Sequence, residues 1–221
     1  MKKDGITQFL TCMMFLTVSM ALCQSCSSMY YAAWEQVGKH KRDLLRDNVS
    51  AVRDEQMEAT EQFKDALTRL KELTGFHGGD LEETYNALKA DYEECEEKAE
   101  AVKVRIEKID HIASDLFEEW DQEIETISST DLRRKSRKKL KLTKERYARL
   151  YRAMEKSENR LDPVLTQLRD QVIYLKHNLN AQAIAGLQAE VSSIELDVRD
   201  LIRDMETSIA QADEFIKALP E

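Results

Sequence analysis

A long row of apolar residues with heptad spacing constrains this chain more than any other feature. The row advances by alternating steps of four and three residues through Leu81, Tyr85, Leu88, Tyr92, Cys95, Ala99, Val102, Ile106, Ile109, Ala113, Leu116 and Trp120. Such spacing is typical of a helix that packs along a partner in a coiled coil. The preceding segment repeats it with one polar interruption, through Leu45, Val49, Val52, Gln56, Ala59, Phe63, Ala66, Leu70 and Leu73. We therefore expect two long helices, over about residues 28–74 and 81–127, packed as a hairpin.

The composition agrees with long helices. The 221 residues include only 6 Gly and 2 Pro, and 34% of them are charged. Sheet folds, barrels and dinucleotide-binding α/β folds need more turns than so few Gly and Pro residues supply. We predict an all-α fold, an elongated antiparallel hairpin or bundle of three or four long helices with coiled-coil packing. These helices would form a single domain over residues 26–221.

Two polar segments are expected to connect the helices. The glycine cluster at residues 75–79 predicts the tip of the first hairpin, with Asp80 and Glu83 spaced as a capping box for the next helix. Residues 128–131 offer several helix N-caps, so a third helix should begin there. Its apolar row is Leu132, Ser136, Leu140, Thr143, Tyr147, Leu150, Met154 and Leu161.

The C-terminal half leaves two arrangements open. Asp162 and Pro163 are either an N-cap with a first-turn proline or a kink within one helix. The apolar row then continues from Leu168 to Ile216 without a second glycine cluster. We therefore expect helices over about residues 131–161 and 163–218, with a kinked continuous helix favoured over a sharp turn near Asn178. Such a turn would instead close a four-helix bundle.

The N-terminal segment resembles a secretory signal. Lys2 and Lys3 precede an apolar stretch at residues 6–22, and charged residues resume only at Glu35. The stretch is short for a bilayer-spanning helix, and Thr, Gln and Ser residues dilute it. We predict a signal peptide of the lipoprotein type over residues 1–25, removed in the mature protein.

A cysteine after the apolar segment indicates attachment of a lipid. Cys26 follows the small residue Ser25, whereas Cys23 follows the bulky Leu22, so Cys26 is the predicted lipidation site. Cys23 and Gln24 depart from the usual lipobox, which leaves a soluble periplasmic product or an uncleaved anchor as alternatives. By resemblance to the lipoprotein sorting system, a serine after the lipidated cysteine directs the protein to the outer membrane.

A basic run after the second connection is the strongest candidate for a contact surface. Its members are Arg133, Arg134, Lys135, Arg137, Lys138, Lys139 and Lys141, and the run extends with fewer charges to residue 152. If the first helix leaves a membrane anchor and the second returns, this run lies near lipid headgroups, which attract each Lys or Arg by about 1 kcal/mol. The alternative is a solvated face offset by Glu118, Glu119, Asp121, Glu123 and Glu125. The net charge of −9 argues against nucleic acid as a partner.

The remaining candidate residues carry weaker signals. Tyr30, Tyr31 and Trp34 suit a membrane interface or the packing of the first helix. Cys95 lies on a seam and is expected to be a buried, unreactive thiol. The four histidines are isolated, and no motif for a metal, a cofactor or a catalytic pair is present. We therefore expect no enzyme activity.

Several strings together resemble a known family. They are Cys26–Tyr31, Lys41–Asp43, Gly79–Glu82, Leu116–Trp120, Pro163–Leu165 and Leu175–Ala181. They resemble a bacterial family of predicted lipoproteins, found mainly in marine gammaproteobacteria and their relatives and defined only as a domain of unknown function. The resemblance implies a helical envelope protein, supports Cys26 as the lipid site and implies no activity. Within its most specific string, His177, Asn178 and Asn180 mark either a hinge or partner contact, or capping and interhelical hydrogen bonds.

These observations predict a lipid-anchored, non-enzymatic scaffold, spacer or adaptor. We expect it in the periplasm, anchored to the outer membrane and bound to another envelope protein. Because a heptad seam also suits pairing between chains, a homo-oligomer is a further possibility. The alternative is a membrane-active protein that binds or shapes an anionic bilayer through residues 133–152.

Overall fold

The computed structural model describes residues 31, 39–74, 81–178, 184 and 187–219. These residues contain no strand, and the helices with defined bounds are α2 (Lys41–Thr74), α3 (Leu81–Thr126), α4 (Thr130–His177) and α6 (Gln188–Ala218). The all-α prediction is confirmed. The chain divides into two compact units, Met1–Leu44 and Leu45–Glu221. The predicted signal peptide and glycine tip lie outside the described residues.

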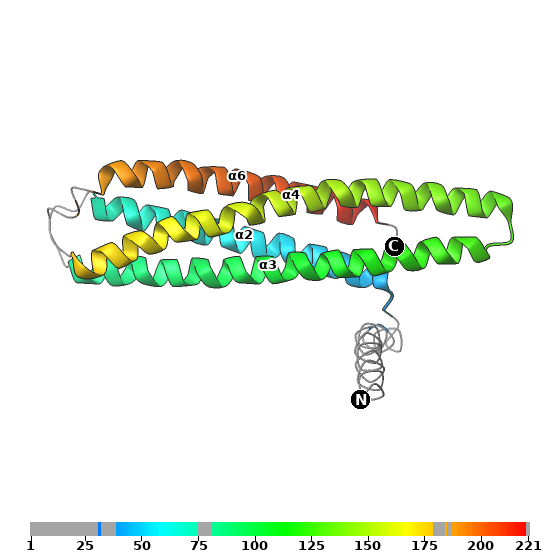
Figure 1. Ribbon diagram of the computed structural model, residues 1–221, viewed down its shortest axis with the longest axis horizontal. Coiled ribbons are helices and arrows are strands. Elements are labelled where there is room, and N and C mark those ends of the chain that lie inside the picture. The colour runs from blue at the N-terminus through cyan, green and yellow to red at the C-terminus, as the bar shows by residue number, and fades with distance from the viewer. Residues whose placement is uncertain (1–30, 32–38, 75–80, 179–183, 185–186, 220–221) are drawn as a thin grey trace, which may run out of the picture. The chain divides into compact units, whose positions relative to one another are not determined.

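The second unit is a four-helix bundle in which neighbouring helices run antiparallel. Arg53, early in α2, pairs with Asp213 near the end of α6, and Lys71 near the end of α2 pairs with Glu195 early in α6. α3 contacts both α2 and α4, and α4 packs against α6. The helices therefore follow one another round the bundle in chain order. Figure 1 shows them aligned along the long axis of the bundle.

The predicted seams form most of the core of this bundle. Every seam residue of α2 from Leu45 to Leu73 is buried, as is every seam residue of α3 from Tyr85 to Ala113. Towards the ends the buried side drifts away from the strict heptad. In α6, Ser208 is buried, whereas Ile209, which belongs to the apolar row predicted between Leu168 and Ile216, is only half-buried. A straight α-helix has 3.6 residues per turn, so it falls out of step with a 3.5-residue pattern.

The prediction for the C-terminal half was wrong about where the helix ends. Helices over 131–161 and 163–218 were expected, but α4 continues through Pro163 to His177, and α6 returns antiparallel from Gln188. Pro163 removes one backbone hydrogen bond. Its neighbours Leu161, Val164 and Leu165 are buried, so their packing holds the helix together across it.

The end of α4 requires no glycine. The backbone N–H of Asn178 donates to the carbonyl of Leu175 at 3.1 Å, and its side-chain amide donates to the carbonyl of Tyr174 at 2.9 Å. These contacts satisfy carbonyls that a helix end leaves without partners. The chain therefore reverses direction after Asn178, which is the alternative that closes a four-helix bundle.

The turn between α3 and α4 follows its prediction closely. The side chain of Ser129 accepts a hydrogen bond from the backbone N–H of Leu132 at 3.4 Å and caps α4. The guanidinium group of Arg133 donates to the carbonyl of Ile127 at 2.6 Å. Ser129 thus stabilises the start of α4, and Arg133 links α4 to the residue that follows α3.

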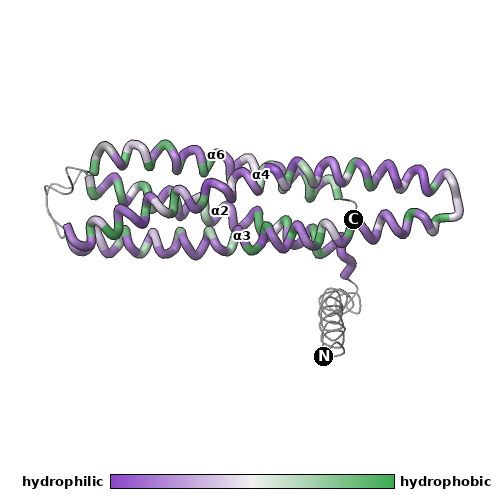
Figure 2. The backbone as a smooth tube through the Cα atoms, in the orientation of Figure 1, coloured by the Kyte–Doolittle hydropathy of each residue, from purple (hydrophilic) through white to green (hydrophobic). Residues whose placement is uncertain are grey.

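Within the second unit, α3 and α4 extend past the ends of the other two helices. Tyr147 of α4 packs on Phe215, close to the end of α6, with ring centroids 6.0 Å apart. From there α4 reaches back through residues 130–142, about 20 Å of helix, alongside residues 116–126 of α3. We call these two segments the arm; Figure 1 shows them projecting at the α3–α4 turn, and Figure 2 shows their α4 side as mainly hydrophilic.

Candidate functional site

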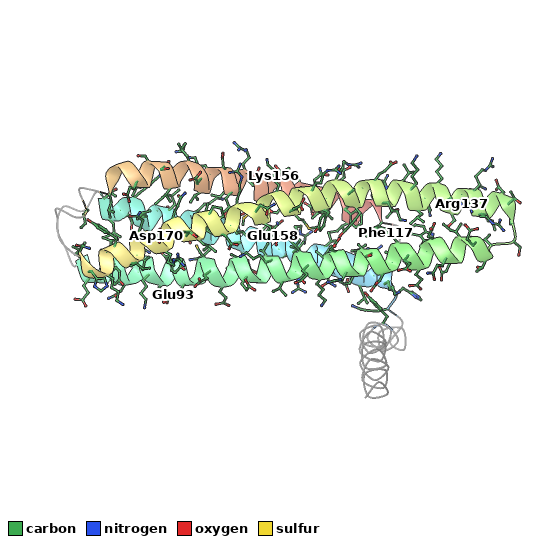
Figure 3. All side chains as sticks on the ribbon, viewed as in Figure 1. Glu93, Phe117, Arg137, Lys156, Glu158 and Asp170 are labelled. Carbon is green, nitrogen blue, oxygen red and sulfur yellow. The ribbon has the colours of Figure 1, made fainter. Side chains whose placement is uncertain are left out.

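The predicted basic run lies on the α4 side of the arm. Six of its seven members are exposed and Arg133 is half-buried. Figure 3 labels Arg137, which extends from this part of α4. The run lies on one continuous helix, α4, which packs against α3. The buried side chains of Leu140 and Thr143 hold α4 in place at the base of the arm.

Part of the run is neutralised by nearby carboxylates. Arg134 and Lys135 both bind Asp131, at 2.6 and 2.7 Å, and Arg137 binds Glu125 across the turn at 2.5 Å. Hydrogen bonds from these cations lower the pKa of both carboxyl groups. Such exposed ion pairs each contribute little to stability, but they reduce the net positive charge near the turn.

The rest of the run carries uncompensated charge. Lys138, Lys139, Lys141 and, further along α4, Arg146 form no ion pair with any residue that the structure describes. The ammonium group of the neighbouring Lys144 lies 5.8 Å from the ring centre of Phe117. The available positive charge of the arm and of its base is therefore concentrated over residues 138–146.

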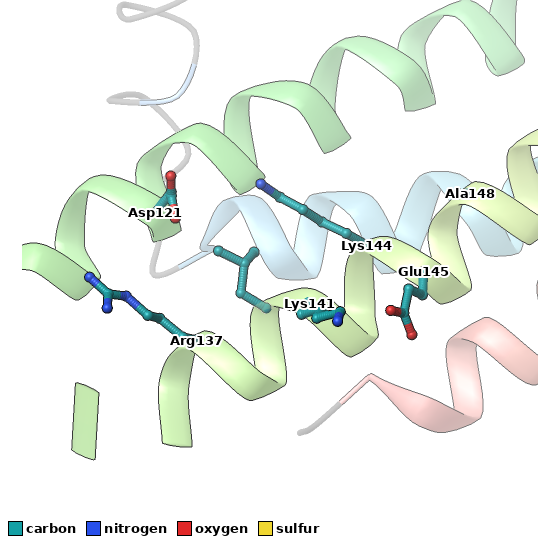
Figure 4. A pocket seen from close by; sticks show the side chains of 7 residues that line it. Asp121, Arg137, Lys141, Lys144, Glu145 and Ala148 are labelled. Atoms are coloured by element: carbon teal, nitrogen blue, oxygen red, sulfur yellow. The ribbon is translucent and has the colours of Figure 1, made fainter. Parts of the chain in front are cut away.

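A shallow, open groove of about 490 Å³ lies beside this cluster, between α3 and α4 (Figure 4). Its lining consists of Asp121, Arg137, Leu140, Lys141, Lys144, Glu145 and Ala148. Three cationic and two acidic side chains share this lining, so the groove itself favours no single ligand charge strongly. The exposed outer surface of α4 is the more distinctive feature.

The other predicted site residues are only partly described. Tyr31 is buried, and the ammonium group of Lys41, in the same unit, lies 4.6 Å from its ring centre. Burial of Tyr31 agrees with the packing alternative. Tyr30 and Trp34 lie outside the described residues, as does Cys26.

The proposed hinge residues lie where α4 ends. His177 is exposed in the last turn, and Asn178 caps the helix as described above. Asn180 lies outside the described residues. The hydrogen bonds of Asn178 agree with the capping alternative, and a partner contact at His177 stays a prediction.

Cys95 is fully buried in the seam of α3. Burial raises the pKa of its thiol, and the nearby carboxylates of Asp91, Glu94 and Asp65 raise it further. Only the thiolate reacts readily, so Cys95 should resist modification by a maleimide at pH 8 in the folded protein and react rapidly in denaturant. Mass spectrometry of the labelled peptide gives the measurement; rapid labelling of Cys95 without denaturant would contradict its burial.

One buried ionic cluster was not predicted from the sequence. Asp204 of α6 is 2% exposed, and its carboxylate accepts hydrogen bonds from Lys156 at 2.7 Å and Arg160 at 2.5 Å, both on α4. Desolvation raises the pKa of Asp204, but the two cations outweigh it and hold the pKa below its ordinary value. The cluster joins α4 to α6. The sequence did contain a signal for this cluster: Lys156 and Arg160 are four residues apart in one helix, and Asp204 lies next to the apolar row of α6.

A second unpredicted feature is a layer of buried polar side chains between α2, α4 and α6. The amide of Gln56 donates to the hydroxyl of Ser157 at 3.1 Å, and the hydroxyl of Thr60 donates to the backbone carbonyl of Gln56 at 2.8 Å and contacts the sulfur of Met205 at 3.4 Å. Polar pairs at seam positions favour one register between helices. Gln56, which interrupts the apolar row in the sequence, therefore has a structural role.

The described residues contain no group of three or more His, Cys, Asp or Glu side chains placed to hold a metal ion. In the same residues, no helix is long and apolar enough to cross a membrane.

A family model described as a protein of unknown function, DUF2959, matches residues 30–219. The chain belongs to the DUF2959 family. This membership confirms the resemblance to a family defined as a domain of unknown function, and the match includes every residue that the structure describes. A search of the curated proteins finds no match.

Proposed function

We propose that this DUF2959 chain is a non-enzymatic, lipid-anchored helical scaffold of the bacterial envelope. In this proposal Cys26 carries the lipid, and the bundle stands in the periplasm on the inner face of the outer membrane. Its task is to hold another envelope protein at a fixed distance from that membrane.

The construction of the bundle supports a spacing role. α4 has 48 residues and is therefore about 70 Å long. Its inner side is packed along most of that length by apolar side chains, and the buried Gln56 and Asp204 make contacts that join helices. Asp204 is bound by two cations and is not open to a substrate. A long bundle with such a core resists bending, as a spacer requires.

The observation that carries the proposal is the end of the bundle at which the chain enters. Leu45, the first residue of the second unit, lies early in α2, and Asn48 one turn later contacts Arg105 of α3. From Arg105, α3 continues towards the α3–α4 turn. The chain, coming from residues 27–44, which we call the tether, therefore enters the second unit at the end of the bundle from which the arm projects, and α2 and α4 finish at the opposite end.

Membrane fractionation of an expressing bacterial host tests the anchor. Cys26→Ala should move the protein from the membrane fraction to the soluble periplasmic fraction, because the thiol that accepts the lipid is lost. Cys23→Ala is the matched control and should leave the protein with the membranes. Retention of Cys26→Ala in the membrane fraction would contradict lipid anchoring at this residue. Release of Cys23→Ala in its place would show that Cys23, and not Cys26, carries the lipid.

A further inference from the structure

A row of five residues runs along one side of α4 in the arm and at its base. Leu132, Lys135, Lys139, Leu142 and Arg146 follow one another at steps of three and four residues, which places them on one side of a helix. We call them the arm row. The two leucines are 57% and 41% exposed, among the most exposed large apolar side chains that the structure describes.

The exposure of the arm row has a structural reason. The next residue of the row, Arg149, lies 3.7 Å from Glu214 of α6, so this side of α4 faces α6 where α6 is present. α6 ends at Ala218, and the arm row continues beyond that level. The arm row therefore continues the side of α4 that packs against α6, but in the arm no helix of the second unit covers this side.

The charge of this side selects its partner. Lys139 and Arg146 have no ion-pair partner among the described residues, nor have Lys138 and Lys141 on the adjoining outer surface. Apolar side chains between free cations are typical of helices that lie on an anionic bilayer. A second copy of the chain would place like charges opposite each other, which is unfavourable.

The tether is long enough for the arm to touch the membrane. From Arg105, beside Asn48, to the end of α3 at Thr126 is about 30 Å of helix. Tyr31 lies beside Lys41, so the chain that can extend towards a bilayer is the stretch from Cys26 to Tyr31, about 17 Å at most, in addition to about 10 Å of α2 from Asn48 to Lys41. Together these lengths are about equal to the distance from Arg105 to the tip of the arm, so a lipid on Cys26 and the tip can reach one bilayer.

We infer that the arm row and the adjoining Lys138 and Lys141 bind anionic phospholipid headgroups of the membrane to which the chain is tethered. The inference rests on the proposed anchor for its geometry. The contact gives the spacer a second attachment, which fixes its direction relative to the membrane. Each cation near an anionic surface adds about 1 kcal/mol of attraction to the membrane.

A fluorescent probe on the arm tests this inference in the full chain. Leu142→Cys is labelled with an environment-sensitive dye in a Cys12→Ser, Cys23→Ser background, in which the other cysteines are the buried Cys95 and the proposed lipid site Cys26. The protein is mixed with vesicles of phosphatidylcholine alone or with phosphatidylglycerol added. We expect a several-fold rise in emission only with phosphatidylglycerol, decreasing as salt screens the charges. The same dye on Leu196→Cys, an exposed residue of α6 outside the arm, should not respond.

Charge variants identify the residues responsible. Lys138→Glu, Lys139→Glu and Lys141→Glu together should abolish the response. The matched control, Lys89→Glu, Lys108→Glu and Lys176→Glu, makes the same change in net charge on exposed residues outside the arm and should retain it. Unchanged helical circular dichroism and unfolding midpoints would show that both variants fold.

Three results would overturn the inference. These are an equal response to both vesicle types, no response to either, and a vesicle-independent response that grows with protein concentration, which would indicate a second copy. Failure to bind phosphatidylcholine vesicles with an intact response to phosphatidylglycerol would support the arm contact and contradict the proposed anchor.

Discussion

Replacing Lys156 and Arg160 together by methionine should lower the free energy of unfolding by about 3–5 kcal/mol at neutral pH. Both cations bind the carboxylate of Asp204, which is 2% exposed. Without them a buried charge has no counter-ion, and burial of such a charge is costly. Urea unfolding followed by circular dichroism gives the measurement.

Two further variants separate charge from packing. Adding Asp204→Leu to the double variant should recover most of the lost stability, because an apolar side chain needs no counter-ion. Arg203→Met removes an exposed ion pair with Asp200 on the same helix and should cost less than about 1 kcal/mol. If the double variant is no less stable than Arg203→Met, Asp204 is not buried against α4 as described.

The pH dependence of the same variants should change sign. In the wild type the two cations hold the pKa of Asp204 below its ordinary value of 3.8, so its contribution is present above that pH and is lost as the pH falls through the folded pKa. In the double variant the cations are gone, and burial raises the pKa of Asp204. The free energy of unfolding should then decrease as the pH rises above 3.8, because the buried carboxyl group loses its proton. Unfolding curves between acid and neutral pH compare the two; parallel curves would contradict the assigned role of the cations.

Phe63→Ala should lower the free energy of unfolding by about 3–5 kcal/mol. Phe63 has no exposed surface and is the largest fully buried side chain of the α2 seam. Its removal leaves a cavity that helices fixed at both ends by further packing cannot fill by moving together. The midpoint of thermal or urea unfolding measures the effect.

Met57→Ala is the matched control for this substitution. Met57 lies on the same helix and is 52% exposed, so its truncation should change stability by less than about 1 kcal/mol. Equal losses in the two variants would mean that α2 does not pack on the bundle through the side that contains Phe63. This pair of variants therefore tests the orientation of α2 as well as its packing.

Most of the fold could be predicted from the sequence, because a long heptad row determines which side of each helix is buried. The heptad row predicted the buried side of α2, and that of α3 as far as Ala113, and Ser129 predicted the start of α4; near the end of α3, Phe117 is buried in place of Leu116. The break in the C-terminal half could not be read in this way. Pro163 is a strong local signal, but the packing of Leu161, Val164 and Leu165 overrides it, whereas α4 ends at Asn178, where the sequence has neither Pro nor Gly.

The candidate site was predicted only as a set of charges. Which members of the basic run are free depends on contacts between residues distant in sequence or across a turn, such as Arg137 with Glu125. The exposure of Leu132 and Leu142 follows from where α6 ends, and that depends on the reversal after Asn178. The sequence alone therefore could not show which cations of the run form ion pairs and which do not.

The measurement that tests the account most directly is the intact mass of the protein purified from membranes of a bacterial host. The proposed spacer requires a chain that begins at Cys26 and carries the added mass of a lipid on that residue, with the lipid absent from Cys26→Ala. A mass corresponding to an unmodified chain, or to a chain that retains residues 1–25, would contradict the anchor and with it the orientation that places the arm at the membrane.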